Sequence, residues 1–200
     1  MSKKIAVFLA PGFEEIEALT TVDVLRRAGF EVVTAAVGKP EQVPLGEDVS
    51  EYDCFGGGVV QGAHGIPVVA DCLADGLQLD ELQMAVCPGG LPGATNLQAD
   101  QHVLELIRGL VAAGRPVAAI CAAPIVLGTA GVLAGRKYTC YPGFEKQIAD
   151  GEYTGARVQN DGLVTTGVGP GASLEFALAL VAVLGKPGLV AQLSQGMIQK

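Results

Sequence analysis

Strand-like and helix-like patterns alternate from the first residues of the chain, and this order constrains the fold more than any other feature. An apolar run at 5–10 precedes apolar residues at helical spacing over 18–28, and a second strand-like run follows at 31–37. Two strands joined by a crossover helix run parallel, because the helix returns the chain to the end of the sheet from which it started. The opening therefore predicts a β-α-β unit.

The alternation continues along the rest of the chain, and it predicts a three-layer α/β/α sandwich of the flavodoxin-like kind with a mostly parallel sheet. Two hundred residues fit one domain, so we predict a single domain over 1–200. Residues 39–62 are rich in Gly, Pro and acidic side chains and are predicted to form a surface excursion, in which 57–60 suits the start of a strand. We expect further strands at 84–87, 116–120 and 138–141, helices at about 100–113, 124–132 and 170–184, and a hairpin at 157–166.

Composition and charge exclude several classes of protein. The formal net charge is −8 and no Lys/Arg cluster occurs, so we predict no nucleic-acid partner. Apolar residues make up 50% of the chain but come in short runs, so we predict no membrane association, and the run at 5–10 is too short for a signal peptide. The cysteines follow neither a disulfide nor a zinc pattern, so we expect reduced thiols, a cytoplasmic location and no metal site. They are Cys54, Cys72, Cys87, Cys121 and Cys140.

Cys121 is the strongest candidate for chemistry. It follows the buried-strand pattern at 116–120 and precedes a helix with Pro124 in its first turn, which is the arrangement of a nucleophile elbow. N–H groups at the start of a helix favour the thiolate, so this position predicts a lowered thiol pKa and a nucleophilic or redox-active sulfur. A buried structural cysteine is the alternative, and spacing alone leaves both interpretations open.

Two further segments are expected at the same edge of the sheet. Pro88-Gly89-Gly90 follows the strand pattern at 84–87 and supplies backbone N–H groups suited to an oxyanion hole, although an ordinary turn has the same sequence. In the first loop, Glu17 is the candidate proton carrier beside the thiol. Glu14 and Glu15 are interpreted instead as a solvated acidic first turn. The segment 167–171 lacks the Lys-Ser/Thr of a phosphate loop, so no nucleotide site is predicted.

The two histidines of the chain lie far from Cys121 in sequence. His102 falls among helix-surface residues and is expected to be solvated, whereas His64 is expected near a pocket or an interface. A Cys-His pair is therefore not established by the sequence.

Five segments together resemble the DJ-1/ThiJ/PfpI superfamily, within the class I glutamine-amidotransferase-like fold, and the DJ-1/ThiJ branch in particular. The resemblance implies that Cys121 is the reactive cysteine, that Glu17 is a protonated glutamate bonded to it, and that Gly89, Gly90 and Ala122 line the adjacent pocket. The segments are 11–17, 22–29, 88–90, 118–124 and 169–177.

The same resemblance implies a homodimer, with Arg27 near the interface and His64 in the place of a polar residue contributed across it. One position departs from the family. Many members carry a histidine before proline where this chain has Tyr141-Pro142. A phenol with a pKa near 10 is a poor base at neutral pH, although its hydroxyl can orient a substrate or water. Cys140 is open to two interpretations, as a resolving thiol for Cys121 or as a buried strand residue.

The resemblance implies an enzyme of the glyoxalase III or deglycase kind that needs no cofactor. Its substrate would be a small carbonyl compound such as methylglyoxal, or a glycated protein. The alternative is a redox-sensing stress or chaperone protein that works through oxidation of Cys121. A role in thiazole monophosphate biosynthesis and a cysteine peptidase activity are less favoured, because the sequence lacks a phosphate-binding signature and the expected histidine.

Overall fold

A seven-stranded sheet forms the centre of the molecule, of which the computed structural model describes residues 3–39 and 58–199. Its strands are β1 (Lys4–Leu9), β2 (Val32–Ala36), β5 (Cys72–Leu73), β6 (Leu82–Cys87), β7 (Val117–Ile120), β10 (Val158–Asp161) and β11 (Val164–Gly167). They lie in the order β10-β11-β7-β6-β1-β2-β5, and all neighbours run parallel except the β10–β11 hairpin. The predicted β-α-β opening and the predicted hairpin are confirmed.

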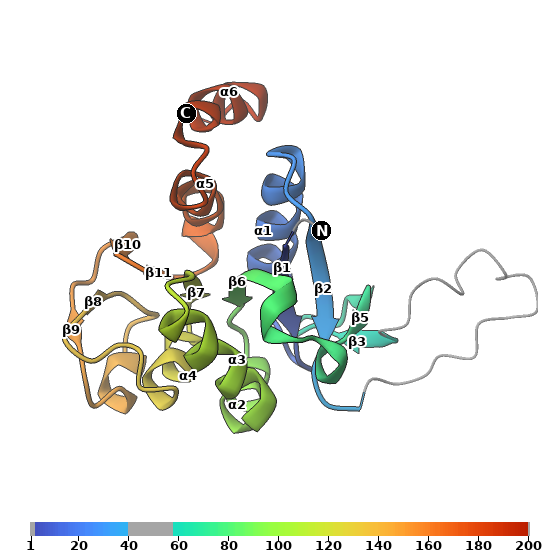
Figure 1. Cartoon of the computed structure of the whole chain (residues 1–200), viewed down its shortest axis with the longest axis vertical. Coiled ribbons are helices and arrows are strands. Elements are labelled where there is room, and N and C mark those ends of the chain that lie inside the picture. Colours follow the sequence, from blue (N-terminus) through green and yellow to red (C-terminus); the bar gives the residue numbers. More distant parts are fainter. Residues whose placement is uncertain (1–2, 40–57, 200) are drawn as a thin grey trace, which may run out of the picture.

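Helices cover both faces of this sheet (Figure 1). Side chains along β1 alternate between the two layers: Ile5, Val7 and Leu9 pack with α1 and α5, whereas Ala6 and Phe8 pack with α2, α3 and α4. The three-layer prediction is confirmed. The bounds are α1 (Glu15–Arg27), α2 (Gly93–Ala99), α3 (Gln101–Ala112), α4 (Pro124–Thr129), α5 (Ser173–Val183) and α6 (Pro187–Gly196), with short 3₁₀ turns at Ala74–Gly76, Leu79–Glu81, Phe144–Gln147 and Pro170–Ala172.

Two pairs of short strands lie outside the main sheet. The antiparallel pair is β3 (Val59–Gln61) with β4 (Pro67–Val69), and the parallel pair is β8 (Lys137–Tyr138) with β9 (Glu152–Tyr153). A strand does start within 57–60, at Val59. The rest of the predicted excursion at 39–62 falls mainly on residues 40–57, outside the described residues.

Several boundaries differ from the sequence predictions, each for a local reason. Helix α1 begins three residues earlier than expected, because the Glu14 carboxylate caps it by accepting the Glu17 N–H. Helix α4 ends at Thr129 rather than 132, since Gly131 adopts a left-handed φ of 75°. The expected strand at 138–141 stops at Tyr138, because the N–H of the next residue, Thr139, donates to the side-chain oxygen of Thr166 instead of to a backbone carbonyl of a neighbouring strand.

Helices α2 and α6 were not predicted. Each is short and has a proline at its first turn or N-cap, and neither carries a long apolar period. Among the helices described, none is long and apolar enough to cross a lipid bilayer.

Candidate active site around Cys121

Cys121 occupies the turn between β7 and α4, as the elbow pattern predicts. Its φ is 63°, a left-handed conformation that is uncommon for a residue with a side chain. Two backbone hydrogen bonds hold this conformation: the Cys121 N–H donates to Gly167 O (2.9 Å), and its carbonyl accepts from Tyr141 N–H (2.8 Å). The turn thus fixes the direction in which the thiol leaves the sheet edge.

Glu17 lies in the first turn of α1 and is fully buried. Its Oε2 accepts the Gly89 N–H at 2.7 Å, and its Oε1 is buried without a regular hydrogen-bond partner in the described part of the chain. A Cβ on Gly89 would lie 2.6 Å from the Cys121 Cβ and 2.7 Å from Glu17 Oε2. The missing side chain at residue 89 therefore lets the carboxyl group and the thiol approach each other.

Burial dominates the acid–base properties of both groups. It raises the pKa of Glu17 to about 7, although the Gly89 N–H and Cys121 act to lower it. Burial and then the negative charge of Glu17 raise the pKa of the Cys121 thiol to about 12, and the N–H groups of Ala122 and Gly90 offset only part of this. The predicted lowering of the thiol pKa is therefore wrong in direction, because burial beside a carboxylate outweighs the N–H groups at the start of α4.

The two groups titrate as one system, since the charge of each changes the pKa of the other. The pair loses one proton near pH 7 and the second near pH 12, so between these values Glu17 and Cys121 hold one proton together. When that proton is on the carboxyl group, the sulfur is a thiolate that faces the N–H groups of Ala122 and Gly90. Glu17 is thus placed to take the thiol proton as the sulfur attacks.

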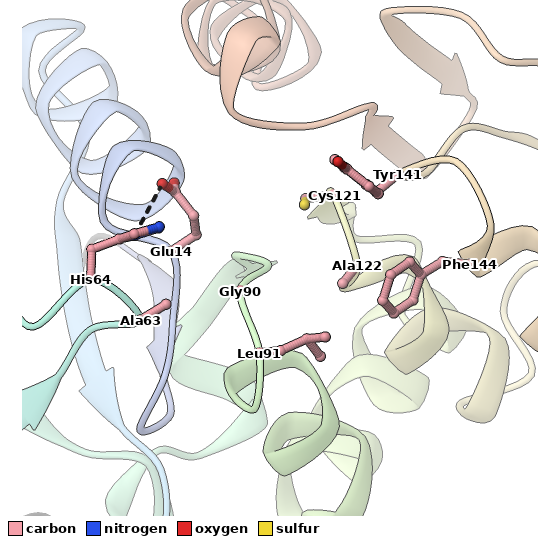
Figure 2. A pocket seen from close by; sticks show the side chains of 9 residues that line it. All are labelled: Glu14, Ala63, His64, Gly90, Leu91, Cys121, Ala122, Tyr141 and Phe144. Carbon is pink, nitrogen blue, oxygen red and sulfur yellow. Dashed lines mark ion pairs between the residues drawn. The ribbon is translucent and has the colours of Figure 1, made fainter.

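A pocket of about 360 Å³ opens over the thiol. Figure 2 shows Cys121 between an apolar side and a polar side of this pocket. Of the predicted site residues, Gly90, Ala122, Tyr141 and His64 line it together with Cys121. Gly89 and Glu17 lie behind the thiol. Arg27 is exposed and forms an ion pair with Asp23 (2.8 Å) on α1.

The sequence missed four residues of the lining: Glu14, Ala63, Leu91 and Phe144. Leu91 directly follows the Gly89-Gly90 turn, and this position in the sequence could have identified it as a pocket residue. Phe144 enters through the 3₁₀ turn Phe144–Gln147, and its ring packs edge-on against Tyr141 with ring centroids 6.4 Å apart.

Glu14 and Glu15 do not form the solvated acidic turn that the sequence suggested, because both are buried, with 5% and 4% exposure. The Glu14 carboxylate accepts the Glu17 N–H at 2.7 Å. The Glu15 carboxylate accepts the His64 N–H at 2.7 Å and lies 2.8 Å from His64 Nδ1. These bonds compensate the burial of the two charges and tie the loop between β3 and β4 to α1.

His64 and Glu15 perturb each other. Burial alone would raise the pKa of Glu15, but its bonds with the His64 side chain and with backbone N–H groups lower it overall. The bond to Glu15 and its charge raise the pKa of His64. Glu14, Glu15 and His64 place one ligand atom each within 4.8 Å of one another, as the only such trio in residues 3–39 and 58–199. Hydrogen bonds within the protein already account for their arrangement.

His102 is half-buried rather than solvated, and its Nε2 lies 3.2 Å from Leu77 O. Cys140 is fully buried in the core cluster beside α2, α3 and α4, whereas Cys121 packs against the cluster on the other face of the sheet. Burial raises the pKa of Cys140 to about 12. This placement favours the interpretation of Cys140 as a core residue over that of a resolving thiol.

The raised pKa of Glu17 predicts how stability depends on pH. A carboxyl group whose pKa rises from 4.5 to about 7 on folding stabilises the fold below pH 4.5, and this contribution is lost as the pH rises through 7. We therefore expect Glu17→Gln to gain a few kcal/mol (about 2 to 3) in free energy of unfolding, relative to the wild type, between pH 5 and pH 8. Urea unfolding at the two pH values measures this difference. Glu105→Gln, at an exposed position on α3, is the control, and equal behaviour of the two variants would contradict the assignment.

Comparisons with known proteins agree with this architecture. The model of the DJ-1/PfpI family matches residues 3–183. The chain is 34% identical to protein dj-1beta of Drosophila melanogaster, and the match covers 99% of this chain and 98% of that one. The crystal structure of Drosophila melanogaster DJ-1beta superposes with a TM-score of 0.86 at 32% identity, over 99% of this chain and 98% of that one. A DJ-1 superfamily protein of Salmonella typhimurium superposes with a TM-score of 0.85 at 34% identity, over 99% of both chains. Protein DJ-1 homolog B of Arabidopsis thaliana is 37% identical over 92% of this chain, which spans only 39% of its length. The chain belongs to the DJ-1/PfpI family.

Proposed function

We propose that this protein is a cofactor-independent enzyme of the glyoxalase III or deglycase type. Its substrates are 2-oxoaldehydes such as methylglyoxal, or the adducts that these form with proteins. The observation that carries the proposal is the buried Glu17–Cys121 pair, which loses its first proton near neutral pH at the base of an open pocket. A deglycase of Pyrococcus abyssi is 28% identical over 79% of this chain and 92% of that protein, which supports the same activity class.

The first step is addition of the Cys121 sulfur to the aldehyde carbon. The S–H proton passes to Glu17, a C–S bond forms, and the carbonyl oxygen takes the electron pair of the broken π bond. The N–H groups of Ala122 and Gly90 face the sulfur and so lie beside the developing oxyanion. The oxygen then takes the proton from Glu17, which gives a neutral hemithioacetal.

The remaining steps need no external oxidant, because one substrate carbon is oxidised while its neighbour is reduced. The hydrogen on the aldehyde carbon moves as a proton to the neighbouring carbonyl carbon, through an enediol, so that the first carbon is oxidised to a thioester and the second is reduced to an alcohol. Water hydrolyses the thioester to a 2-hydroxy acid and restores the thiol. Glu17, with a pKa of about 7, is suited to accept and return protons in these steps at neutral pH.

Formation of D-lactate from methylglyoxal tests the proposed activity. We expect Cys121→Ala to abolish it and Glu17→Gln to lower kcat by about 10² or more, because the variant keeps the shape of the side chain but cannot carry the proton. Cys72→Ala, at a half-buried cysteine on β5, is the matched control and should retain activity. Lactate formation absent from the wild type, or equal in the wild type and Cys121→Ala, would refute the proposal.

A redox-sensing role of the same thiol is the second candidate. The Oε1 of Glu17 favours it, because this buried atom has no regular hydrogen-bond partner among the described residues, and a protonated carboxyl group there could donate a hydrogen bond to a sulfinate oxygen on Cys121. The solved structures include an oxidised Toxoplasma gondii DJ-1, which superposes with a TM-score of 0.84 at 33% identity over 98% of both chains.

Graded peroxide followed by peptide mass spectrometry tests this role. We expect sulfinic acid at Cys121 before any oxidation of Cys87 or Cys140, which are fully buried. Glu17→Gln should lower the yield of sulfinic acid and raise that of sulfonic acid, since the proposed O–H donor is lost. Uniform modification of the cysteines would argue against a sensor.

We also propose that the protein forms a homodimer in the cytoplasm, through α1 and the β3–β4 hairpin. Exposed apolar side chains occur on both elements: Ile16 and Leu19 on α1, and Ile66 and Val69 on the hairpin, with 39–57% exposure. The bonds from Glu15 to His64 and Ile66 hold the two elements together. Exposed apolar side chains on two elements that are bonded together are typical of an interaction surface.

Sedimentation equilibrium measures the predicted dimer. The wild type should have twice the mass of the chain, and Ile16→Glu combined with Ile66→Glu should shift it to the monomer, because two charges would be buried at the interface. Ile198→Glu, at a residue with 81% exposure near the C-terminus, should remain dimeric. A monomeric wild type, or a double variant that remains dimeric, would overturn the assignment.

A further inference from the structure

The pocket over Cys121 has an apolar wall that the chemistry of methylglyoxal does not use. Leu91, Tyr141 and Phe144 form this wall: in Figure 2, Tyr141 and Phe144 lie on the side of Cys121 away from Glu14 and His64, and Leu91 lies below. Leu91 is 54% exposed and Tyr141 is 49% exposed, so both present apolar surface to the opening rather than to the core. Large apolar side chains left open beside a reactive thiol are typical of a binding surface.

The wall is positioned by the same contacts that position the thiol. Leu91 follows Gly90, whose N–H faces the sulfur. The Tyr141 N–H donates to the Cys121 carbonyl at 2.8 Å, and the Tyr141 ring packs edge-on against Phe144. A group bound to the wall is therefore held at a fixed place relative to the sulfur, which is the condition for orienting a substrate.

The opposite side of the pocket is polar and acidic. Glu14 lines it and is buried, and His64 beside it is bonded to the Glu15 carboxylate. Negative charge close to Glu17 and Glu14 disfavours anionic substrates such as 2-oxo acids. On the polar side, the ring of His64, whose pKa is raised by Glu15, can donate a hydrogen bond to a carbonyl oxygen of a neutral dicarbonyl compound. The apolar wall is then left for the substituent on the second carbonyl carbon.

The volume of the pocket also indicates that the substrate carries a substituent that reaches the apolar wall. A cavity of about 360 Å³ is within the range of sites that enclose drug-sized molecules, and the three-carbon methylglyoxal would fill only a small part of it. We propose that the preferred substrates carry an aromatic or branched apolar substituent, as in an aryl 2-oxoaldehyde, and that Leu91, Tyr141 and Phe144 bind this substituent. The substrate class rests on the proposed function, whereas the apolar binding wall does not.

Alkylation of Cys121 tests the wall without requiring turnover. The probes are iodoacetamide and N-benzyl iodoacetamide, with rates at Cys121 followed by peptide mass spectrometry and divided by their rates with glutathione. We expect the benzyl reagent to be favoured about fivefold or more in the wild type. Leu91→Ala, Phe144→Ala and Tyr141→Ala should each reduce this preference severalfold, and Tyr141→Phe, which keeps the ring, should preserve it.

Matched controls separate the wall from general effects of substitution. Leu73→Ala and Tyr153→Ala remove an exposed leucine and an exposed tyrosine outside the pocket and should leave the preference unchanged. Leu91 is more than half exposed, so its variant is expected to fold normally, and thermal unfolding checks this. No preference for the benzyl reagent in the wild type, or a preference that survives both Leu91→Ala and Phe144→Ala, overturns the proposal.

Turnover then distinguishes this inference from the proposed function. A kcat/KM for phenylglyoxal above that for methylglyoxal, reduced by Phe144→Ala more for phenylglyoxal than for methylglyoxal, supports the substrate class. A kcat/KM that favours methylglyoxal overturns it. If neither aldehyde is consumed but the alkylation preference is present, the proposed function and the substrate class fail while the apolar binding wall stands.

Discussion

The site depends on one physical constraint, which is the burial of the Glu17 carboxyl group beside the Cys121 thiol. A buried carboxylate is costly unless it is hydrogen-bonded or protonated, and here one oxygen accepts the Gly89 N–H while the other lacks a regular partner. Protonation resolves the cost near neutral pH. Once ionised, the carboxyl group can take the proton of the neighbouring thiol, so the reactivity of the sulfur depends on how the carboxyl group is buried.

Three segments far apart in sequence produce this arrangement. Each follows a parallel strand of the central sheet: the loop after β1 leads to Glu17, the turn after β6 contains Gly89, and the turn after β7 contains Cys121. The carboxyl ends of neighbouring parallel strands meet at one edge of the sheet, where such folds place their ligands. Because β6 lies between β1 and β7, Gly89 comes between the carboxyl group and the thiol. Strand order thus accounts for the meeting of these residues.

The order of strands and helices and the position of Cys121 could be predicted, because both depend on local patterns and on the rule that consecutive parallel strands end at the same sheet edge. The environment of the acidic loop could not. Glu14 and Glu15 have the sequence signature of a solvated first turn, yet both are buried. Glu14 accepts the Glu17 N–H, and Glu15 accepts the His64 and Ile66 N–H groups of the β3–β4 hairpin, about fifty residues away in sequence. The direction of the Cys121 pKa was missed for the same reason, since it depends on burial and on the charge of Glu17.

The apolar wall was also hidden from the sequence. Leu91 and Phe144 lie in segments without periodicity, and the second segment is held over the thiol by long-range bonds such as that from the Tyr141 N–H to the Cys121 carbonyl. The tyrosine in place of the expected histidine replaces a basic imidazole by a phenol ring, which lines the proposed apolar wall.

The most direct test of the shared proton is the pH dependence of Cys121 alkylation by iodoacetamide, measured by peptide mass spectrometry in the wild type and in Glu17→Gln. The wild-type rate should rise with an inflection near pH 7, where the pair loses its first proton and the Glu17 carboxylate becomes available to take the thiol proton as the sulfur attacks. In Glu17→Gln the inflection near pH 7 should disappear, and the thiol should titrate above the ordinary value of about 8.5 because it is buried without a proton acceptor. The same inflection in both proteins, or a wild-type thiol that titrates at the ordinary value, would contradict the account.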